Sequence, residues 1–263
     1  MKQLFTDQMG RDVELSFPPT RIISLVPSLT EMLCYIGLEK ELVGITKFCV
    51  HPAFAKKRYT IIGGTKNLHL DKITALQPSL LIGNKEENQA TQIKALAKHY
   101  PVWMSDVNNL PEALQMIRGL GDVCDRKGKS HVLATEIEKR FADLSAKVSP
   151  PLLRTAYLIW RKPYMVAASD TFIDDMLQRA GFENVFASLS RYPVVSTDDL
   201  KAACPELIFL SSEPYPFREK HIEELKAICP QAHIRLVDGE LFSWYGSRLL
   251  KSAAYFLELQ KSI

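Results

Sequence analysis

The chain has 263 residues, of which 46% are hydrophobic and 24% charged, and its formal net charge is +3. This composition is typical of soluble globular proteins, and the length allows one large domain or two lobes, since single cores rarely grow beyond ~250 residues. So small a net charge, without a long basic run, does not favour nucleic acid or an anionic membrane as a partner. No apolar run reaches the ~18 residues that a membrane span needs.

Two further features bear on the cellular compartment. The first seven residues, Met1–Asp7, show neither an apolar core nor a small-residue cleavage site, so either a signal was removed or the protein stays in the cytoplasm. The five cysteines are odd in number and include no C-x-x-C pair, which argues against a disulfide framework and a structural zinc site. We expect most of them to be small buried hydrophobes. They are Cys34, Cys49, Cys124, Cys204 and Cys229.

The first third of the chain alternates short apolar strands with helical segments. A hairpin over 5–17 with Gly10 in its turn precedes the apolar strand 21–26. Ser28 and Glu31 have the spacing of a capping box, which predicts a helix from there to Gly37. The next predicted elements are a strand at 42–46, a helix at 70–76, a strand at 80–82, a helix at 90–98 and a strand at 102–104.

A long amphipathic helix follows Pro111. Its apolar positions recur at helical spacing, and charged residues occupy the other faces. About 20 residues of helix would extend ~30 Å, and 149–151, Ser-Pro-Pro, should end it. The apolar positions are Leu133, Ile137, Phe141, Leu144 and Val148.

A second strand–helix series follows. Its predicted elements are a strand at 156–160, a helix at 172–180, a strand at 207–210, a helix at 221–228, a strand at 234–237 and a helix at 247–259. This alternation predicts an α/β fold of two lobes, each a mostly parallel sheet flanked by helices, joined by one long backbone helix. We place the N-terminal lobe with its hairpin at 1–122, the linking helix at 123–149 and the C-terminal lobe at 150–263.

Several of these segments resemble one known family. The runs 21–31, 43–46, 51–52, 71–81 and 174–186 are similar to segments of the cobalamin and ferric-siderophore binding proteins of ATP-binding-cassette importers. The resemblance extends from about Phe5 to Leu259. It implies a metal-chelate ligand in a cleft between the lobes, delivery to a membrane permease, no catalysis, and a periplasmic or cell-surface location. We expect a monomer.

Loops that follow parallel strands are where open α/β sheets place ligands, and here those loops carry aromatic, amide and charged side chains. Such groups suit a large flat ligand with a polar periphery. In the first lobe the candidate ligand-binding residues are Ser28, Phe48, His51, Thr65, Lys66, Asn84, Lys85 and Glu86. In the second lobe they are Trp160, Tyr164, Arg191, Tyr215, Phe242, Trp244, Tyr245 and Arg248.

Some candidates also have plain structural interpretations. Ser28 fits a helix cap better than a ligand contact, and Trp244 and Tyr245 fit packing as well as they fit binding. His51 is a candidate metal ligand, although a single histidine is more often a hydrogen-bonded loop residue.

Cobalamin is the first choice of ligand, and haem and ferric siderophores stay open. Haem would need an axial ligand, for which His51, Tyr164 or Tyr245 could serve. A siderophore would favour arginines such as Arg161.

The resemblance also implies that Asp71 and Asp198 dock the permease, at positions where the relatives carry Glu. An enzyme is not indicated, since no nucleophile–base pair or clustered metal site occurs. The alternative function is a cytoplasmic carrier or sensor of the same ligands, without an importer.

Overall fold

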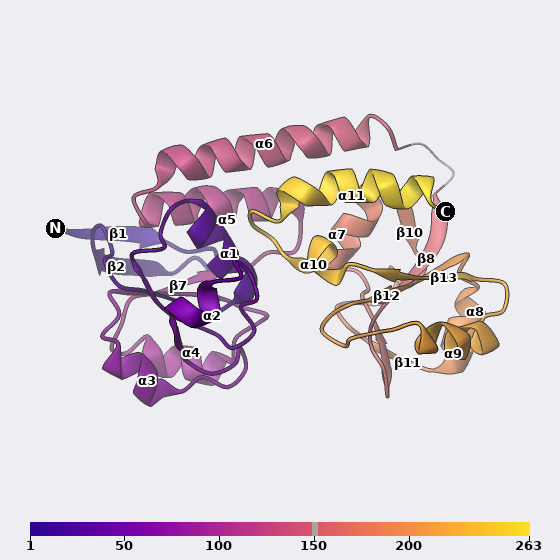
Figure 1. Ribbon diagram of the computed structural model, residues 1–263, viewed down its shortest axis with the longest axis horizontal. Coiled ribbons are helices and arrows are strands. Elements are labelled where there is room, and N and C mark those ends of the chain that lie inside the picture. Colours follow the sequence, from indigo (N-terminus) through magenta and orange to yellow (C-terminus); the bar gives the residue numbers. More distant parts are fainter. Residues whose placement is uncertain (149–151) are drawn as a thin grey trace. The chain divides into compact units, whose positions relative to one another are not determined.

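The computed structural model of the protein describes residues 1–148 and 152–263 (Figure 1). The chain forms two compact units. Unit 1 contains Met1–Val107, Pro111–Ile137 and Tyr245–Arg248, and unit 2 contains Asn108–Leu110, Glu138–Trp244 and Leu249–Ile263. The two-part α/β architecture predicted from the sequence is therefore present.

Unit 1 is built on a five-stranded sheet with the order β5-β4-β3-β6-β7, in which every pairing is parallel. Its strands are β3 Ile22–Ser24, β4 Leu42–Ile45, β5 Thr60–Ile61, β6 Leu80–Asn84 and β7 Val102–Ser105. β3, β6 and β7 are buried along their whole length, as expected for strands covered by helices on both faces.

Helices connect the strands of unit 1. They are α1 Pro27–Tyr35, α2 Ala55–Arg58, α3 Leu70–Ala75, α4 Ala90–Leu96 and α5 Leu110–Val123. One core cluster combines the strand residues Ile23 and Leu81 with Ile73 of α3 and Ile93 of α4. Ile73 and Ile93 lie on the faces of their helices that cover the sheet. The pattern of buried apolar residues therefore explains why these strands and helices could be predicted from the sequence. The short elements β5 and α2 were not predicted.

The start of α1 corrects one prediction. Its N-cap is Val26, Pro27 occupies the first turn, and no side chain caps the helix, so the proposed capping box of Ser28 and Glu31 is wrong. Proline suits the first turn because it has no N–H to leave unsatisfied there. The Glu31 carboxylate instead accepts two hydrogen bonds from Arg248, at 2.8 and 3.0 Å.

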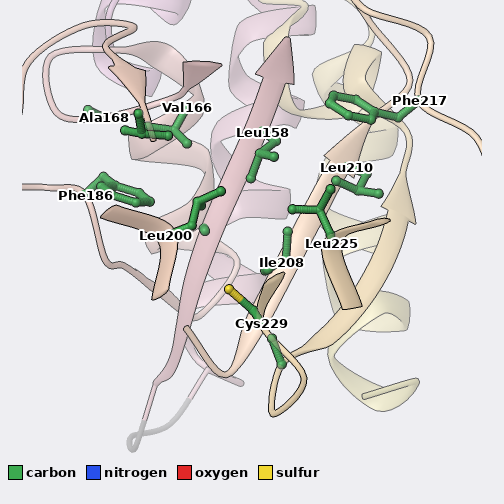
Figure 2. Packing of buried hydrophobic residues seen from close by; sticks show 13 residues of the cluster. Leu158, Val166, Ala168, Phe186, Leu200, Ile208, Leu210, Phe217, Leu225 and Cys229 are labelled. Carbon is green, nitrogen blue, oxygen red and sulfur yellow. The ribbon is translucent and has the colours of Figure 1, made fainter. Parts of the chain in front are cut away.

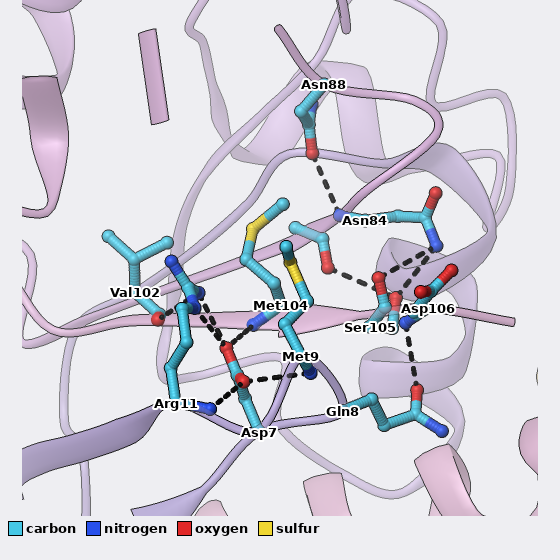
Figure 3. A network of polar contacts seen from close by, with 11 residues as sticks. Asp7, Gln8, Met9, Arg11, Asn84, Asn88, Val102, Met104, Ser105 and Asp106 are labelled. Carbon is cyan, nitrogen blue, oxygen red and sulfur yellow. Dashed lines mark hydrogen bonds and ion pairs between the residues drawn. The ribbon is translucent and has the colours of Figure 1, made fainter. Parts of the chain in front are cut away.

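The N-terminal hairpin pairs β1 Lys2–Thr6 with β2 Asp12–Ser16 in antiparallel register, and Gly10 lies in the turn with φ +70°. A buried carboxylate attaches it to the sheet (Figure 3). Asp7 accepts hydrogen bonds from the backbone N–H of Met9 and Arg11, from the Arg11 guanidinium and from the Met104 N–H of β7. A cavity of about 320 Å³ lies between 11–14 of the hairpin and 97–102, at the amino end of β7.

The long helix is α6, Lys127–Ser145, which contributes residues to both units. Leu133, Ile137, Phe141 and Leu144 are buried as predicted. In unit 2 the Phe141 ring lies 6.3 Å from that of Phe256. Ser149, Pro150 and Pro151, which were predicted to end the helix, lie outside the described residues.

Unit 2 contains a mixed sheet with the order β11-β9-β8-β12-β13, and β10 also pairs with β8. β8, β10, β12 and β13 run parallel, whereas β9 is antiparallel to β8 and to β11. The bounds are β8 Leu153–Trp160, β9 Tyr164–Val166, β10 Phe182–Asn184, β11 Val194–Val195, β12 Leu207–Ser211 and β13 His233–Val237. The short strands β9, β10 and β11 were not predicted.

The core of unit 2 joins β8 and β12 to the helices beside them (Figure 2). Leu158 and Ile208 pack with Leu200 of α8 and Leu225 of α9. The helices are α7 Phe172–Arg179, α8 Thr197–Ala203, α9 Lys220–Ile228, α10 Gly239–Ser243 and α11 Leu249–Lys261. α8 has a complete capping box formed by Ser196 and Asp199. α10 was not predicted.

The cysteines behave largely as expected. All five are free thiols, and four are buried, with Cys204 exposed. None of the helices in residues 1–148 and 152–263 is long and apolar enough to cross a membrane.

Candidate ligand-binding site

The carboxyl ends of the parallel strands in unit 1 carry most of its predicted site residues. β4 and β5 lie on one side of β3, and β6 and β7 lie on the other, so the strand order reverses between β3 and β6. Open α/β sheets bind ligands at the carboxyl ends of the strands beside such a reversal. We call the loops that follow β3, β4, β5 and β6 at this edge the unit 1 rim.

Asn88 holds three of these loops together. Its amide nitrogen donates to the carbonyl oxygens of Leu25 after β3, at 3.2 Å, and of Thr65 after β5, at 3.0 Å. Its amide oxygen accepts from the Asn84 N–H at 2.9 Å, at the end of β6. Asn88 is only 5% exposed. One buried side chain therefore fixes the relative positions of the rim loops.

The end of β6 is fixed in turn by Asn84, a predicted site residue that is 2% exposed. Its amide nitrogen donates to the Ser105 carbonyl of β7 (Figure 3). Its amide oxygen accepts from the N–H groups of Glu86 and Glu87. Asn84 thus shapes the loop, while the exposed Lys85 and the half-buried Glu86 stand at its surface.

Two lysines, Lys66 and Lys85, lie in the loops of the unit 1 rim. The Lys85 ammonium pairs with Asp106 at 2.6 Å. The exposed Lys66 donates to the Glu86 carbonyl, which links the loops after β5 and β6. Thr65 is 8% exposed and contributes mainly through its backbone.

Phe48, after β4, is an exposed aromatic residue of the unit 1 rim, with 51% of its surface accessible. A Cβ added to Gly64 would lie 3.2 Å from the Phe48 ring, so the absence of a side chain there lets the ring lie against the backbone. The Lys47 ammonium lies 5.1 Å from the centre of the same ring. The result is an aromatic face beside a cation.

Beneath Phe48, the loop is anchored by a small polar cluster. The Cys49 thiol lies 3.1 Å from the Thr30 hydroxyl of α1 and 3.4 Å from the Thr46 hydroxyl. Burial raises the pKa of Cys49, so the thiol stays protonated and takes part as a neutral group. Ser28 is buried at the start of α1, and His51 is half-buried two residues beyond Cys49.

The carboxyl end of β8 in unit 2 carries a second aromatic group. Trp160 is 40% exposed, and its ring centre lies 5.6 Å from that of Tyr215. Tyr215 also contacts Phe217 at 4.7 Å and His221 at 5.5 Å. Tyr215, Phe217 and His221 therefore form a packed aromatic cluster that supports Trp160. We call these four residues the unit 2 rim.

A charged pair lies beside Tyr164. Arg161 donates to both oxygens of Glu224 at 2.5–3.0 Å, and the Tyr164 hydroxyl donates to the same carboxylate. Hydrogen bonding from Arg161 lowers the pKa of Glu224 to about 2. A cavity of about 420 Å³ is lined by Lys162–Tyr164, Val195–Thr197, Glu224 and Ile228.

The half-buried Glu213 positions Trp244. The Glu213 carboxylate accepts from the Ser243 hydroxyl at 2.7 Å and from the Trp244 indole N–H at 2.8 Å. Burial raises the pKa of Glu213, and the nearby Glu240 and Asp238 raise it further. The ionised form is therefore disfavoured in the folded protein, and Trp244, which is 7% exposed, is held by packing and this bond.

Glu213 gives a first prediction. Because its pKa is higher in the folded than in the unfolded chain, the folded state loses stability as pH rises through that interval. Glu213→Gln keeps the acceptor for Ser243 and Trp244 without the charge, so we expect it to raise the free energy of unfolding at pH 7 by roughly 1 kcal/mol. Urea unfolding at pH 7 and pH 4 checks this. The gain should shrink at pH 4, and a pH-independent difference would contradict the assignment.

The remaining predicted residues lie deeper or elsewhere. Phe242 is fully buried, with its ring 5.1 Å from Tyr157 and 4.6 Å from Phe256. Tyr245 and Arg248 are buried in unit 1. Arg191 of unit 2 donates to Asn108 at 2.8 Å.

Asn88, Glu213 and Glu224 were not among the predicted site residues. Asn88 lies in the loop after β6 that also carries the predicted residues Lys85 and Glu86. The pairing of Glu224 with Arg161 joins positions 63 residues apart, which no local pattern reveals.

No group of three or more metal-ligating side chains is found within residues 1–148 and 152–263. If His51 binds a metal, it can do so as a single axial ligand to an ion already held by a chelate. That role stays a prediction.

Comparison with known proteins identifies the family. Residues 22–228 match the family model described as periplasmic binding protein. The chain belongs to the periplasmic binding protein family. It is 27% identical over 197 residues to the vitamin B12-binding protein of Vibrio parahaemolyticus, which covers 74% of this chain and 71% of the relative.

Solved structures show the same fold. The periplasmic vitamin B12 binding protein BtuF of Vibrio cholerae superposes with a TM-score of 0.81 at 22% identity, covering 94% of this chain and 100% of that protein. A periplasmic haem binding protein from Pseudomonas aeruginosa superposes with a TM-score of 0.78 at 24% identity, covering 91% and 93%. The predicted family is therefore confirmed, and its members are solute-binding proteins.

Proposed function

We propose that this protein captures a metal-chelate ligand for uptake by an ABC-type importer, with cobalamin the first choice and haem or a ferric siderophore next. The observation that carries the proposal is an exposed aromatic side chain at the carboxyl edge of each sheet, Phe48 in unit 1 and Trp160 in unit 2. Both rings are supported by packed neighbours and present flat apolar faces. Because they are already ordered, they lose little conformational entropy when a ligand binds.

The surroundings of these rings suit a macrocycle with a polar periphery. Lys47 and Lys66 of the unit 1 rim offer charged donors, and the half-buried Glu86 offers a carboxylate. A mixed rim of this kind can contact amides as well as carboxylates. The names of the matched relatives, which bind vitamin B12 or haem, support the same ligand class.

Titration with cyanocobalamin, haemin and a ferric siderophore tests the proposal. All three ligands are coloured, so binding can be followed by absorbance as well as by isothermal titration calorimetry. We expect saturable one-to-one binding of one class. Phe48→Ala and Trp160→Ala should each weaken it roughly tenfold, since one aromatic contact contributes about 1 kcal/mol or more. Leu189→Ala is the control, an exposed apolar residue of unit 2 outside both rims. The absence of binding by all three ligands would refute the proposal.

Delivery to a permease gives a separate prediction. Asp71 lies exposed in the first turn of α3, and Asp198 lies exposed in the first turn of α8, 3.3 Å from the Lys201 ammonium. If both dock to permease arginines, Asp71→Ala combined with Asp198→Ala should weaken permease binding at low salt about tenfold and leave ligand affinity unchanged. Binding to the permease in nanodiscs measures this effect.

The matched control for docking is Glu183→Ala, an exposed carboxylate on β10. Equal permease binding by the double variant and the control would limit the role of both aspartates to a favourable interaction with the helix dipole in the first turn.

A further inference from the structure

The charge of the chain is distributed unevenly. Residues 42–70 contain no Asp or Glu, and they carry five of the cationic side chains, so this segment has a charge of +5 while the rest of the chain has −2. The five are Lys47, Lys56, Lys57, Arg58 and Lys66. The small net charge of the whole chain is therefore the sum of a local basic region and a slightly acidic remainder.

Exposed apolar side chains lie in the same segment. Val50 is 44% exposed and Phe54 is 43% exposed. Lys56, Lys57 and Arg58 of α2 are exposed as well, while Ala55 at the start of that helix is fully buried and holds it against unit 1. We call Val50, Phe54, Lys56, Lys57 and Arg58 the basic patch.

Contacts within the patch show that the charged and apolar groups are neighbours. The Arg58 guanidinium carbon lies 5.8 Å from the centre of the Phe54 ring and 5.6 Å from that of Tyr59. The Phe54 and Tyr59 rings are themselves 6.4 Å apart. Because the Arg58 cation lies beside the exposed Phe54 ring, any surface that buries the ring also comes into contact with the charge.

From this arrangement we infer that the basic patch of unit 1 binds the surface of an anionic lipid bilayer. Phe54 and Val50 enter the boundary between headgroups and acyl chains, and the three cations contact lipid phosphates. Aromatic and aliphatic side chains flanked by Lys and Arg are the composition of surfaces that lie in a membrane interface. Each cation near an anionic membrane strengthens binding about fivefold.

A lipid surface fits better than a folded acidic partner. All five residues of the patch are exposed to solvent. A fluid layer of headgroups can adapt to protruding side chains, whereas a protein partner needs a complementary shape. Val50 and Phe54 lie in the same loop after β4 as Phe48. The patch does not include Phe48 or Lys66, so lipid binding can be measured without the proposed ligand.

Flotation with lipid vesicles tests the inference on the full chain without any ligand. We expect binding to vesicles of phosphatidylcholine mixed with phosphatidylglycerol, little binding to phosphatidylcholine alone, and release as salt rises because screening shortens the reach of the charges. The triple variant Lys56→Gln, Lys57→Gln, Arg58→Gln should lower partitioning about a hundredfold. Phe54→Ser alone should lower it about fivefold, because half of a phenylalanine ring is available for burial.

The control is Arg218→Gln, Lys220→Gln, Lys226→Gln in unit 2, which changes the net charge equally at three exposed positions. Far-UV circular dichroism and thermal unfolding of every variant establish that it is folded. The inference is overturned if the wild type does not float with anionic vesicles, or if the control loses as much binding as the patch variant. It is equally overturned if Phe54→Ser binds like the wild type, since binding would then be a general charge effect.

Discussion

Replacing Asn88 by alanine is expected to weaken ligand binding at least tenfold while the protein remains folded. The change removes two donated hydrogen bonds and one accepted hydrogen bond that join the loops after β3, β5 and β6. The Leu25 and Thr65 carbonyls lose a buried donor, and loss of such partners costs about 1–3 kcal/mol. Loops freed from a common anchor must then be ordered by the ligand, which lowers its affinity.

A matched control exists in unit 2. Asn184 is also 5% exposed, donates to the Ala167 carbonyl and the Asp174 carboxylate, and accepts from the Phe186 N–H. It is the last residue of β10, which pairs with the first residues of β8 rather than with its carboxyl end. Asn184→Ala should therefore cost a similar free energy of unfolding and leave ligand affinity unchanged.

A measurement without ligand separates the Asn88 prediction from the proposed function. Amide hydrogen exchange in 25–28, 63–67 and 84–88 of free Asn88→Ala should accelerate relative to the wild type. If exchange there is unchanged, Asn88 does not position the rim. If exchange rises and affinity does not fall, the rim is not where the ligand binds.

The second large effect is expected from the ion pair of Glu31 and Arg248. Arg248 is 8% exposed, and its guanidinium donates two hydrogen bonds to Glu31. Glu31→Ala removes that carboxylate from a buried cation and should lower the free energy of unfolding by about 3 kcal/mol. Urea unfolding measures the loss.

Two comparisons sharpen this prediction. The double variant Glu31→Leu, Arg248→Met should recover most of the stability, because apolar residues can replace a buried pair. Glu14→Ala removes the exposed pair with Lys2, whose side chains are 55% and 71% exposed, and should change stability by less than about 1 kcal/mol. Equal losses for Glu31→Ala and Glu14→Ala would show that burial adds nothing to the pair.

The Glu31–Arg248 pair also explains a feature of the chain path. Residues 245–248 belong to unit 1, although their sequence neighbours belong to unit 2. Gly246 has φ +143°, and a Cβ there would lie 3.2 Å from Met32 of α1. The missing side chain allows the close approach, and the ion pair holds the segment there.

Much of the architecture follows from local patterns. Short apolar runs such as 21–26 and 207–210, which alternate with helical segments, indicate strands of a covered sheet, and helical spacing in α6 marks one buried face. These signals depend on neighbours within a few residues, which is why the order of the main strands and helices was predictable. The family was recognisable because the segments that resemble it keep their order and spacing along the chain.

The site depended on contacts that no local pattern contains. Glu31 has the spacing of a helix cap, yet it pairs with a residue 217 positions away. Phe242 and Trp160 are both aromatic residues predicted to bind the ligand, but one is fully buried and the other is 40% exposed. The sequence alone therefore determined the strands, the helices and the binding-protein family, because periodic burial is a local property. Only the tertiary structure decided which loop side chains reach solvent and which, like Asn88 and Arg248, bind the loops together, because hydrogen bonds between distant segments exist only once the chain has folded.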